Sequence, residues 1–487
     1  MAPVLVVGAG PVGLTMAAEL ARYGVPVRLI ERSAEPTKTS KALVVWSRTL
    51  ELMDRMGCTA GFLDVGVKAR GAVFRSGGRE LAHADFHDIP SPYNFGCMVP
   101  QSETERLLTS HLGTLGVRIE RRVELKTFEA GESGVQCRLA HADGRDEEID
   151  TPWLVGCDGA HSTVRNALGL AFEGYATDDN WILADVRLEG ETSPPADRLA
   201  IFLHADGPFV TFPIPGGRTR VVATTGKADP DHARPEPTLD EVQTLIDART
   251  GGGFRAVDPV WLSHFRINER KLSEYRHGRV FLAGDAAHVH SPAGGQGMNT
   301  GIQDAINLAW KLAMVQRGQA VPAILDSYSP ERSAVGAVVL RNAGQLTEMG
   351  TLANPVAQLL RNAALRLFLG FHAVQDRMAA AMSETDLAYG KSPLSSGPHG
   401  GDRLPPRDYA GAPPGAGQEP RFVVFSNDSV EGRNLAARYP GLLEDAPRIP
   451  SRADTLQIVR PDGYIGFAGT AGDWAGARTY LDRLSPS

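Results

Sequence analysis

Cysteine is scarce in this chain of 487 residues, which has four (Cys58, Cys97, Cys137 and Cys157), far apart and none in a Cys-x-x-Cys pair. This spacing signals neither a zinc site nor a redox-active dithiol, and it fits free thiols in a reducing cytoplasm. Long apolar runs are also missing: no stretch reaches the ~18 apolar residues of a membrane-spanning helix. The apolar N-terminal run has no basic leader, so we expect a buried strand there and no signal peptide.

An excess of positive charge is absent as well. The formal net charge is −7, and the basic residues are scattered along the chain. Nucleic-acid-binding proteins concentrate basic residues on one face, so this composition argues against such a partner. Hydrophobic content of 42% and charged content of 22% are ordinary for a soluble protein, and the length predicts about two to four domains.

The first motif is glycine-rich and lies at the extreme N-terminus. A short apolar strand at 4–7 runs into Gly8-Ala9-Gly10-Pro11-Val12-Gly13, which opens a predicted helix to about Tyr23; a second strand over 26–31 ends at Glu31. In the dinucleotide-binding fingerprint the three glycines permit a tight turn, close approach of the pyrophosphate, and packing of helix on strand. Glu31 lies at the spacing of the ribose-binding acid. The motif predicts a dinucleotide site, but it does not separate NAD from FAD.

Two further turns follow predicted strands. The strand 153–157 leads into Asp158-Gly159, with Ser162 and Arg165 in the next turn. The strand 279–283 leads into Gly284-Asp285, and Pro292 to Asn299 then precede a helix with apolar residues at helical spacing. A carboxylate at a strand end accepts hydrogen bonds from hydroxyl groups, and a helix N-terminus favours negative charge. These turns therefore suit a polyhydroxyl chain and an anionic ring.

In this order, the three motifs resemble the class A flavoprotein monooxygenases, which are aromatic hydroxylases with a p-hydroxybenzoate hydroxylase-like fold. The likeness is greatest to the branch with polyketide and phenol hydroxylases, and it extends over residues 1 to about 390. It implies an α/β chain (α+β overall) with three parts. These are a Rossmann-like FAD-binding domain (1–70, 101–172 and 268–390), an inserted antiparallel-sheet substrate domain (71–100 and 173–267), and a linker with a small thioredoxin-like domain (391–487). Within the inserted domain, apolar segments separated by turn residues predict four strands, at 181–188, 199–203, 209–214 and 219–224.

The resemblance also implies a role for each matched residue. Those at the FAD pyrophosphate and the adenosine half would be Gly8, Gly10, Pro11, Val12, Gly13, Glu31, Arg32 and the backbone at Leu125. Those nearer the flavin would be Gln101, Asp285 on the ribityl hydroxyls, Pro292, Gly295, and the backbone of Gly297, Met298 and Asn299. Asp158 would brace the cofactor region. Lys41 replaces the usual arginine, and a lysine cannot form the bidentate fork.

The activity that the resemblance implies is monooxygenation of a phenolic or polyketide-type aromatic compound with NAD(P)H and O2, through a C4a-hydroperoxyflavin. Because the chain has one dinucleotide fingerprint, FAD would be resident and NADPH (or NADH) a transient co-substrate. Baeyer–Villiger insertion, epoxidation and antibiotic inactivation on the same fold stay open, as does an FAD-binding protein without oxygenase activity. A homodimer is possible; neither a membrane nor a metal is expected.

The substrate-activating residue cannot be read from the sequence. His288 and His290 are expected to be turn residues that hydrogen-bond the backbone. Five aromatic residues could line a pocket or belong to the ordinary core: Tyr93, Phe95, Tyr175, Phe202 and Phe212.

Overall fold

A parallel sheet forms the centre of the nucleotide-binding part. The computed structural model describes residues 1–37, 42–227, 235–352 and 354–486. The six strands lie in the order β18-β19-β12-β1-β2-β8, and all neighbours pair in parallel except the edge strand β18. Their bounds are β1 Val4–Val7, β2 Val27–Glu31, β8 Ile119–Arg121, β12 Leu154–Gly156, β18 Arg276–His277 and β19 Val280–Leu282. Strands buried on both faces explain the continuous apolar runs in the sequence.

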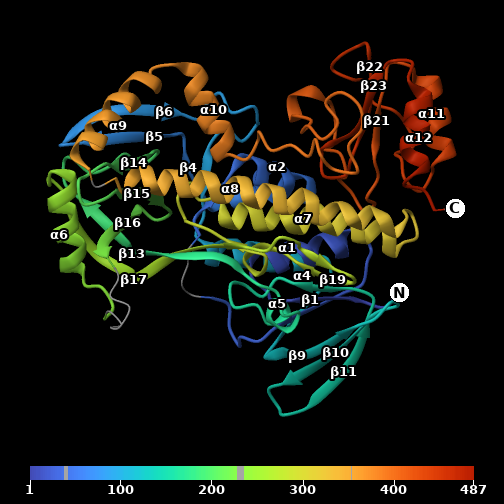
Figure 1. Cartoon of the computed structure of the whole chain (residues 1–487), viewed down its shortest axis with the longest axis horizontal. Coiled ribbons are helices and arrows are strands. Elements are labelled where there is room, and N and C mark those ends of the chain that lie inside the picture. The colour runs from blue at the N-terminus through green and yellow to red at the C-terminus, as the bar shows by residue number, and fades with distance from the viewer. Residues whose placement is uncertain (38–41, 228–234, 353, 487) are drawn as a thin grey trace.

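Helices α1 (Pro11–Arg22) and α7 (Gly297–Gln316) pack together over this sheet, and α4 (Gln101–Thr114) packs against α1. Gly10 caps α1 and Pro11 occupies its first position, where the missing proline N–H costs nothing. The predicted helix after the N-terminal turn is thus confirmed. A three-stranded sheet, β9 (Val123–Ala130), β10 (Val135–His141) and β11 (Asp146–Thr151), lies below the parallel sheet in Figure 1.

The inserted sheet has eight strands in the order β20-β17-β13-β16-β15-β14-β5-β6. Their bounds are β5 Gly71–Ser76, β6 Arg79–Asp85, β13 Glu173–Glu189, β14 Leu199–Phe202, β15 Phe209–Ile214, β16 Arg218–Lys227, β17 Arg255–Lys271 and β20 His288–Val289. The four strands expected over 181–224 are present. Neither the long strand β17 nor helix α6 (Leu239–Thr250), which covers one face of the sheet, was predicted. The sheet lies at the left of Figure 1.

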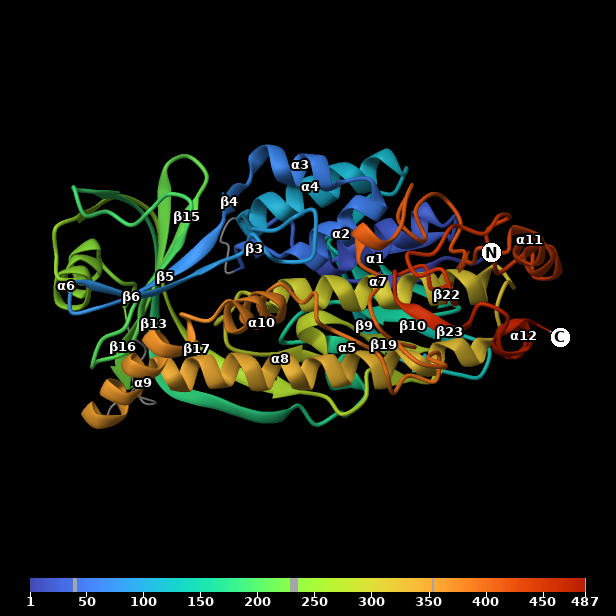
Figure 2. The same cartoon turned by 90° about the horizontal axis from the view of Figure 1, so that it is seen from above.

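Around these sheets lie short elements and two long helices. Strands β3 (Val44–Val45), β4 (Val67–Ala69) and β7 (Gly96–Met98) form a small sheet beside α2 (Ser47–Met56) and α3 (Thr59–Val65). Helix α8 (Tyr328–Gly350) runs beside α7 and reaches β17 of the large sheet, as Figures 1 and 2 show. Helices α9 (Pro355–Phe368) and α10 (His372–Met382) then pack on β6.

The C-terminal part has three antiparallel strands, β21 (Val423–Phe425), β22 (Thr455–Val459) and β23 (Ile465–Thr470), with α11 (Ser429–Arg438) and α12 (Trp474–Asp482). It lies at the far end of the molecule from the eight-stranded sheet (Figure 2). The turn after β22 enters the interface with α2, α7 and α8, where Asp462 is buried. No helix in the described ranges has both the length and the apolar character that crossing a bilayer requires.

Candidate functional site

The three sequence motifs converge in the structure. The turns that contain Gly8, Asp158 and Gly284 follow β1, β12 and β19, which are neighbours in the parallel sheet. Backbone hydrogen bonds continue the sheet into the turns, from Cys157 N to the Val7 carbonyl (2.8 Å) and from Ala283 N to the Gly156 carbonyl (3.0 Å). Ligands of open α/β sheets bind at the carboxyl ends of the strands, which is where the three turns meet.

The glycines of the first turn have separate functions. A Cβ on Gly13 would lie 1.8 Å from the Gly8 carbonyl oxygen, and one on Gly8, where φ is +100°, would lie 2.5 Å from the Cys157 carbonyl oxygen. The lack of a side chain at these two positions therefore lets the first turn pack closely against its own helix and against the second turn. A Cβ on Gly10 would meet nothing within 4 Å. Gly10 borders open space, as a position approached by a pyrophosphate requires.

Val12 joins the first turn to the third. A Cβ on Gly284 or on Gly301 would each lie 2.7 Å from the Val12 side chain. Both glycines therefore leave room for Val12 between η1 (Gly284–Ala286) and α7. This packing fixes α1, η1 and α7 relative to one another around the candidate groove.

The expected adenosine side is described in part. Glu31 is half-buried and accepts hydrogen bonds from Ala9 N (2.9 Å) and Ser33 N (2.8 Å), which attach it to the glycine-rich turn. The side chain of Arg32 is exposed. Leu125 is buried in β9. Lys41 lies outside the described residues.

Gln101 begins helix α4. Its amide nitrogen donates to Glu105 Oε1 (3.0 Å), and its backbone N–H donates to the Ala42 carbonyl (3.1 Å). The residue thus connects α4 to the segment that leads into β3. Burial raises the pKa of Glu105 above its ordinary value.

Asp158 braces the second turn. Its Oδ2 accepts hydrogen bonds from Thr163 N (2.7 Å) and Val164 N (3.2 Å) at the start of α5 (Thr163–Ala167). Burial raises the pKa of Asp158, and its Oδ1 is buried with no hydrogen-bond partner among the described residues. Arg165 donates to the Ala286 carbonyl (3.1 Å), which ties this turn to the third. An orphaned carboxylate oxygen at this point suits a ligand rich in hydroxyl groups.

The third turn does not lead directly into a helix. The 3₁₀ turn η1 and strand β20 come between β19 and α7, because residues 288–289 pair with β17 of the large sheet. Asp285 is exposed at this turn, and Pro292 is exposed further along. Gly295 has φ +64°, and a Cβ there would lie 2.2 Å from Val44 Cγ1.

Helix α7 points its N-terminus at this loop. Its first backbone bond runs from Thr300 N to the Gln296 carbonyl (2.8 Å), so the N–H groups of Gly297, Met298 and Asn299 have no intrahelical acceptor. The Asn299 side chain is engaged elsewhere: it accepts from Trp46 N (2.8 Å) and donates to the Val44 and Gly295 carbonyls (2.9 Å each). The helix end therefore offers backbone donors and the positive end of its dipole.

A buried ion cluster supports the helix from behind. Asp304 accepts from Arg332 Nε (2.6 Å) and from Gly284 N (3.0 Å), and it contacts His288 Nε2 (2.7 Å). Although burial opposes ionisation, the charges of Arg332 and His288 hold the pKa of Asp304 below its ordinary value. The interpretation of His290 is confirmed, since its Nδ1 bonds to the Ser291 carbonyl (2.8 Å), whereas that of His288 is wrong because its partner is a side chain.

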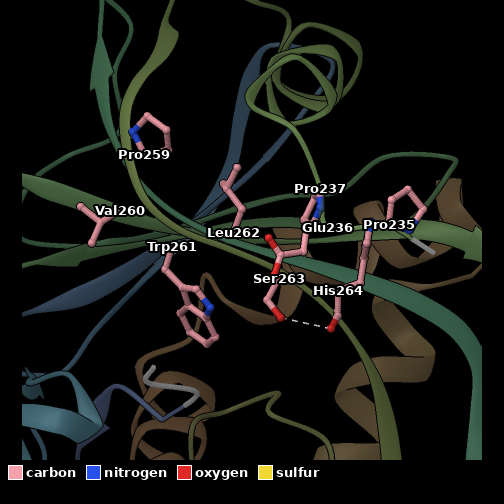
Figure 3. A pocket seen from close by; sticks show the side chains of 9 residues that line it. All are labelled: Pro235, Glu236, Pro237, Pro259, Val260, Trp261, Leu262, Ser263 and His264. Carbon is pink, nitrogen blue, oxygen red and sulfur yellow. Dashed lines mark hydrogen bonds between the residues drawn. The ribbon is translucent and has the colours of Figure 1, made fainter. Parts of the chain in front are cut away.

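One face of the eight-stranded sheet is aromatic and turned away from α6. Cross-strand pairs place Trp181 opposite Phe265, Leu183 opposite Ser263, and Asp185 opposite Trp261. Alternation along each strand puts all six on one face, while Ile182 and Ala223 pack under α6. Figure 3 shows Trp261 turned to one side of β17 and Leu262 turned to the other. The hollow of about 560 Å³ drawn there contains no residue of the three turns.

The five aromatic residues that the sequence suggested as candidates for a pocket lie in different parts of the structure. Phe212 lies on the aromatic face of the sheet and packs in a cluster that includes Trp46. The Trp46 indole donates to the Gly294 carbonyl (2.8 Å). Phe202 packs instead on the α6 side, and Tyr175 is 58% exposed. Tyr93 and Phe95 form an edge-on pair and pack against the core that contains α2 and α3. Sequence reasoning missed Trp181, Trp261 and Phe265, because no local motif distinguishes them from core residues.

A buried ion pair interrupts the aromatic face. Arg220 is paired by two bonds of 2.7 Å with Asp185, and its guanidinium lies 5.5 Å from the centre of the Trp261 ring. Phe212 is directly opposite Arg220 on the neighbouring strand. The face thus combines a broad apolar surface with a fixed polar group.

These residues fit FAD. The candidate site combines a glycine-lined turn open at Gly10, an orphaned oxygen on Asp158, a carboxylate at Asp285, and a helix end with backbone donors. Phe212, on the aromatic sheet face, packs in the cluster of Trp46, which bonds to the loop before α7. Such a set can hold a dinucleotide along the turns and an aromatic ring near the end of α7.

Comparison with known proteins agrees with this geometry. Residues 1–343 match the family model described as "FAD binding domain". The chain is 36% identical to 6-methylpretetramide 4-monooxygenase of Streptomyces rimosus, over 99% of this chain and 92% of the relative. It is 34% identical to pentachlorophenol 4-monooxygenase of Sphingobium chlorophenolicum, over 84% and 76%.

A solved structure extends the match to the whole fold. The OxyS anhydrotetracycline hydroxylase from Streptomyces rimosus superposes with a TM-score of 0.83 at 31% identity and covers 99% of both chains. The resemblance to the class A flavoprotein monooxygenases is confirmed. The chain belongs to the FAD binding domain family and is an FAD-dependent monooxygenase.

Proposed function

We propose that the chain hydroxylates a polycyclic aromatic substrate of the polyketide type, or a simpler phenol, at the expense of NAD(P)H and O2. The observation that carries the proposal is the aromatic face of the eight-stranded sheet that is turned away from α6. Phe212 on this face packs in the cluster of Trp46, whose indole bonds to the loop before α7. The names of the two monooxygenase relatives and of the hydroxylase structure support this substrate class.

In this proposal the cofactor residues act as the resemblance implies. Gly8, Gly10, Pro11, Val12 and Gly13 approach the pyrophosphate, Glu31 and Arg32 serve the adenosine half with the backbone at Leu125, and Asp285 receives ribityl hydroxyls. Gln101, Pro292, Gly295, Gly297, Met298 and Asn299 surround the flavin, and Asp158 braces the turns. Bound FAD, once reduced by NAD(P)H, would supply the activation of O2.

The protein's own contribution is orientation, electrostatics and exclusion of water. The N–H groups at the start of α7 and the helix dipole stabilise negative charge on a bound ring. Trp181, Phe212, Trp261 and Phe265 offer an apolar surface for an aromatic substrate, and the Arg220–Asp185 pair offers a polar contact for its oxygen substituents. We assign no general base, because the described residues show no carboxylate–histidine pair on this face.

Two expectations stay predictions: a cytoplasmic location, from the four unpaired cysteines, and a homodimer. Hydroxylation is tested by measuring NADPH and NADH oxidation with a panel of phenols and polyphenolic polyketides under ¹⁸O₂. We expect substrate-stimulated oxidation and one labelled oxygen on a ring carbon of the product. A lactone or epoxide product would favour the Baeyer–Villiger or epoxidation alternative. Tight FAD binding with no substrate-coupled oxygen consumption would contradict the proposal.

A further inference from the structure

Glu384 occupies a position that suits a glutamate poorly. Its side chain is fully buried, and its φ is +58°, in the left-handed region that favours glycine. Burial of a carboxyl group and a left-handed backbone are both unfavourable for this residue, and glycine would avoid both. A glutamate at such an unfavourable position points to a functional role.

The contacts of Glu384 are with helix α7. Thr300 Oγ1 donates to one carboxyl oxygen (2.7 Å), and Gln303 Nε2 donates to the other. Both donors are neutral, and no described lysine, arginine or histidine forms an ion pair with this carboxyl group. The two bonds fix the carboxyl group against the first turns of the helix whose N-terminus faces the candidate flavin site.

Charged groups surround Glu384 at longer range. Arg332 on α8 attracts its negative charge, and Asp304 on α7 repels it. The Arg403 guanidinium donates to the Thr385 carbonyl of the same loop (3.2 Å), and the backbone N–H of Arg48 donates to the Ser383 carbonyl (3.2 Å). Burial is the largest influence and raises the pKa of Glu384 to about 7. The carboxyl group is therefore largely neutral below pH 7 and ionised above it.

The loop that contains Glu384 joins two sides of the site. Gln296, the N-cap of α7, donates from Nε2 to the Ala381 carbonyl (2.8 Å). Just before this loop, α10 packs Met378, Ala379 and Met382 into the cluster that includes Phe212 and Trp46. Glu384 thus lies where the helix beside the aromatic face meets the helix that receives the flavin.

We propose that Glu384 is a positioning residue for the flavin: its carboxyl group fastens the end of α10 to the first turns of α7, and its ionisation places a negative charge beside that helix end. The proposal rests on the proposed FAD site at the N-terminus of α7. A negative charge near a helix N-terminus competes with an anionic ligand for the same positive field.

The test is titration of the full-length apoprotein with FAD between pH 6 and 8.5, followed by the change in flavin fluorescence. For the wild type, we expect the Kd to rise roughly three- to tenfold across this range, the size of one charge acting at a helix end. Glu384→Gln keeps the shape without the ionisation, so its Kd should show no such rise. Asp386→Asn, at an exposed carboxyl group in the same loop, is the matched control and should keep the wild-type profile.

A second variant separates positioning from mere packing. Glu384→Gly removes the clamp and relieves the backbone, so it should bind FAD more weakly at every pH while its melting temperature stays the same or rises. Wild-type affinity in Glu384→Gly, or an unchanged pH profile in Glu384→Gln, would overturn the proposal. A protein that binds FAD with this pH dependence but hydroxylates no aromatic compound would contradict the proposed function alone.

Discussion

The turns proposed to receive FAD and the joint between the C-terminal part and helices α2, α7 and α8 are built from different kinds of residue. At the turns, Gly8, Gly13 and Gly284 let backbone and small side chains pack within distances that a Cβ would forbid. At the joint, Glu331, Arg460 and Asp462 form a buried ion network with Lys311. The first arrangement keeps room and backbone N–H groups for a ligand. The second places charges where no ligand is expected.

The joint contacts helices α2 and α7, and the N-terminus of α7 lies at the proposed FAD site. Arg48 of α2 donates to the Asp462 carbonyl (2.6 Å), and Trp310 of α7 donates to Asp462 Oδ2 (3.1 Å). Although burial opposes ionisation, Arg460 and Lys311 hold the pKa of Glu331 well below its usual range, while burial lowers the pKa of Lys311 to about 8. The C-terminal part therefore completes the core of the FAD-binding part and is more than an appended module.

The largest effect is expected at the closest backbone approach. Gly13→Val places side-chain carbons where 1.8 Å separates a Cβ from the Gly8 carbonyl oxygen, so the turn cannot keep its shape. We expect loss of FAD binding and of most soluble folded protein, measured by flavin content and circular dichroism. Gly10→Ala, at a position open to solvent or ligand, is the matched control and should fold normally. Equal behaviour of the two variants would contradict the packing account.

The second effect concerns the joint. Asp462→Ala leaves Trp310 Nε1 and Arg460 Nε without their buried acceptor and removes one of the two carboxylates that pair with Arg460, which should lower the free energy of unfolding by about 3–5 kcal/mol. Chemical denaturation measures this loss. Asp445→Ala, whose side chain is 94% exposed, should change stability by less than about 0.5 kcal/mol. Should the two variants denature alike, the joint does not stabilise the fold as described.

The third effect separates binding from folding at the turns. Asp285→Ala removes the exposed carboxylate proposed to accept ribityl hydroxyls, at a cost of about 1.5–3 kcal/mol per charged hydrogen bond. The FAD Kd should rise roughly tenfold to a hundredfold, while the apoprotein keeps its melting temperature. Full FAD occupancy after dilution would show that Asp285 does not bind the cofactor.

The smallest effect tests whether His290, in the loop before α7, is kept uncharged. Burial and the neighbouring His288 lower the pKa of His290 from its usual 6.5 to about 4. A histidine with a depressed pKa binds fewer protons when folded, so its contribution to stability is present above pH 6.5 and is lost as the pH falls toward 4. Relative to His290→Gln, the wild type should lose about 1–2 kcal/mol between pH 7 and pH 4.5. Parallel pH curves for the two proteins would contradict this account.

The contrast between local turns and long-range buried pairs explains which features could be predicted from the sequence. The glycine turns could be recognised because Gly8, Gly10 and Gly13 meet steric demands within a few residues of one strand and one helix. The four strands over 181–224 could be predicted because they are short apolar segments separated by turn residues. Strand β17 was missed because its residues 255–271 combine Pro259, charged residues and partial exposure, which weaken the alternation.

Long-range pairs could not be predicted. Asp462 and Trp310 are 152 positions apart, and Glu384 meets Thr300 across 84 positions. The identities of these residues do not predict their partners. The buried environment in which they pair forms only when α7, α8 and the C-terminal turn pack together. The partner of His288 was missed for the same reason: Asp304 lies across the loop, on α7.

The most direct test of the central claim is identification of the nucleotide released from natively purified protein by mild denaturation. Convergence of the turns after β1, β12 and β19 at the end of α7 predicts one FAD for each chain, with a yellow protein whose absorbance bleaches under NADPH. Recovery of a nicotinamide nucleotide in its place, with no flavin, would contradict the account.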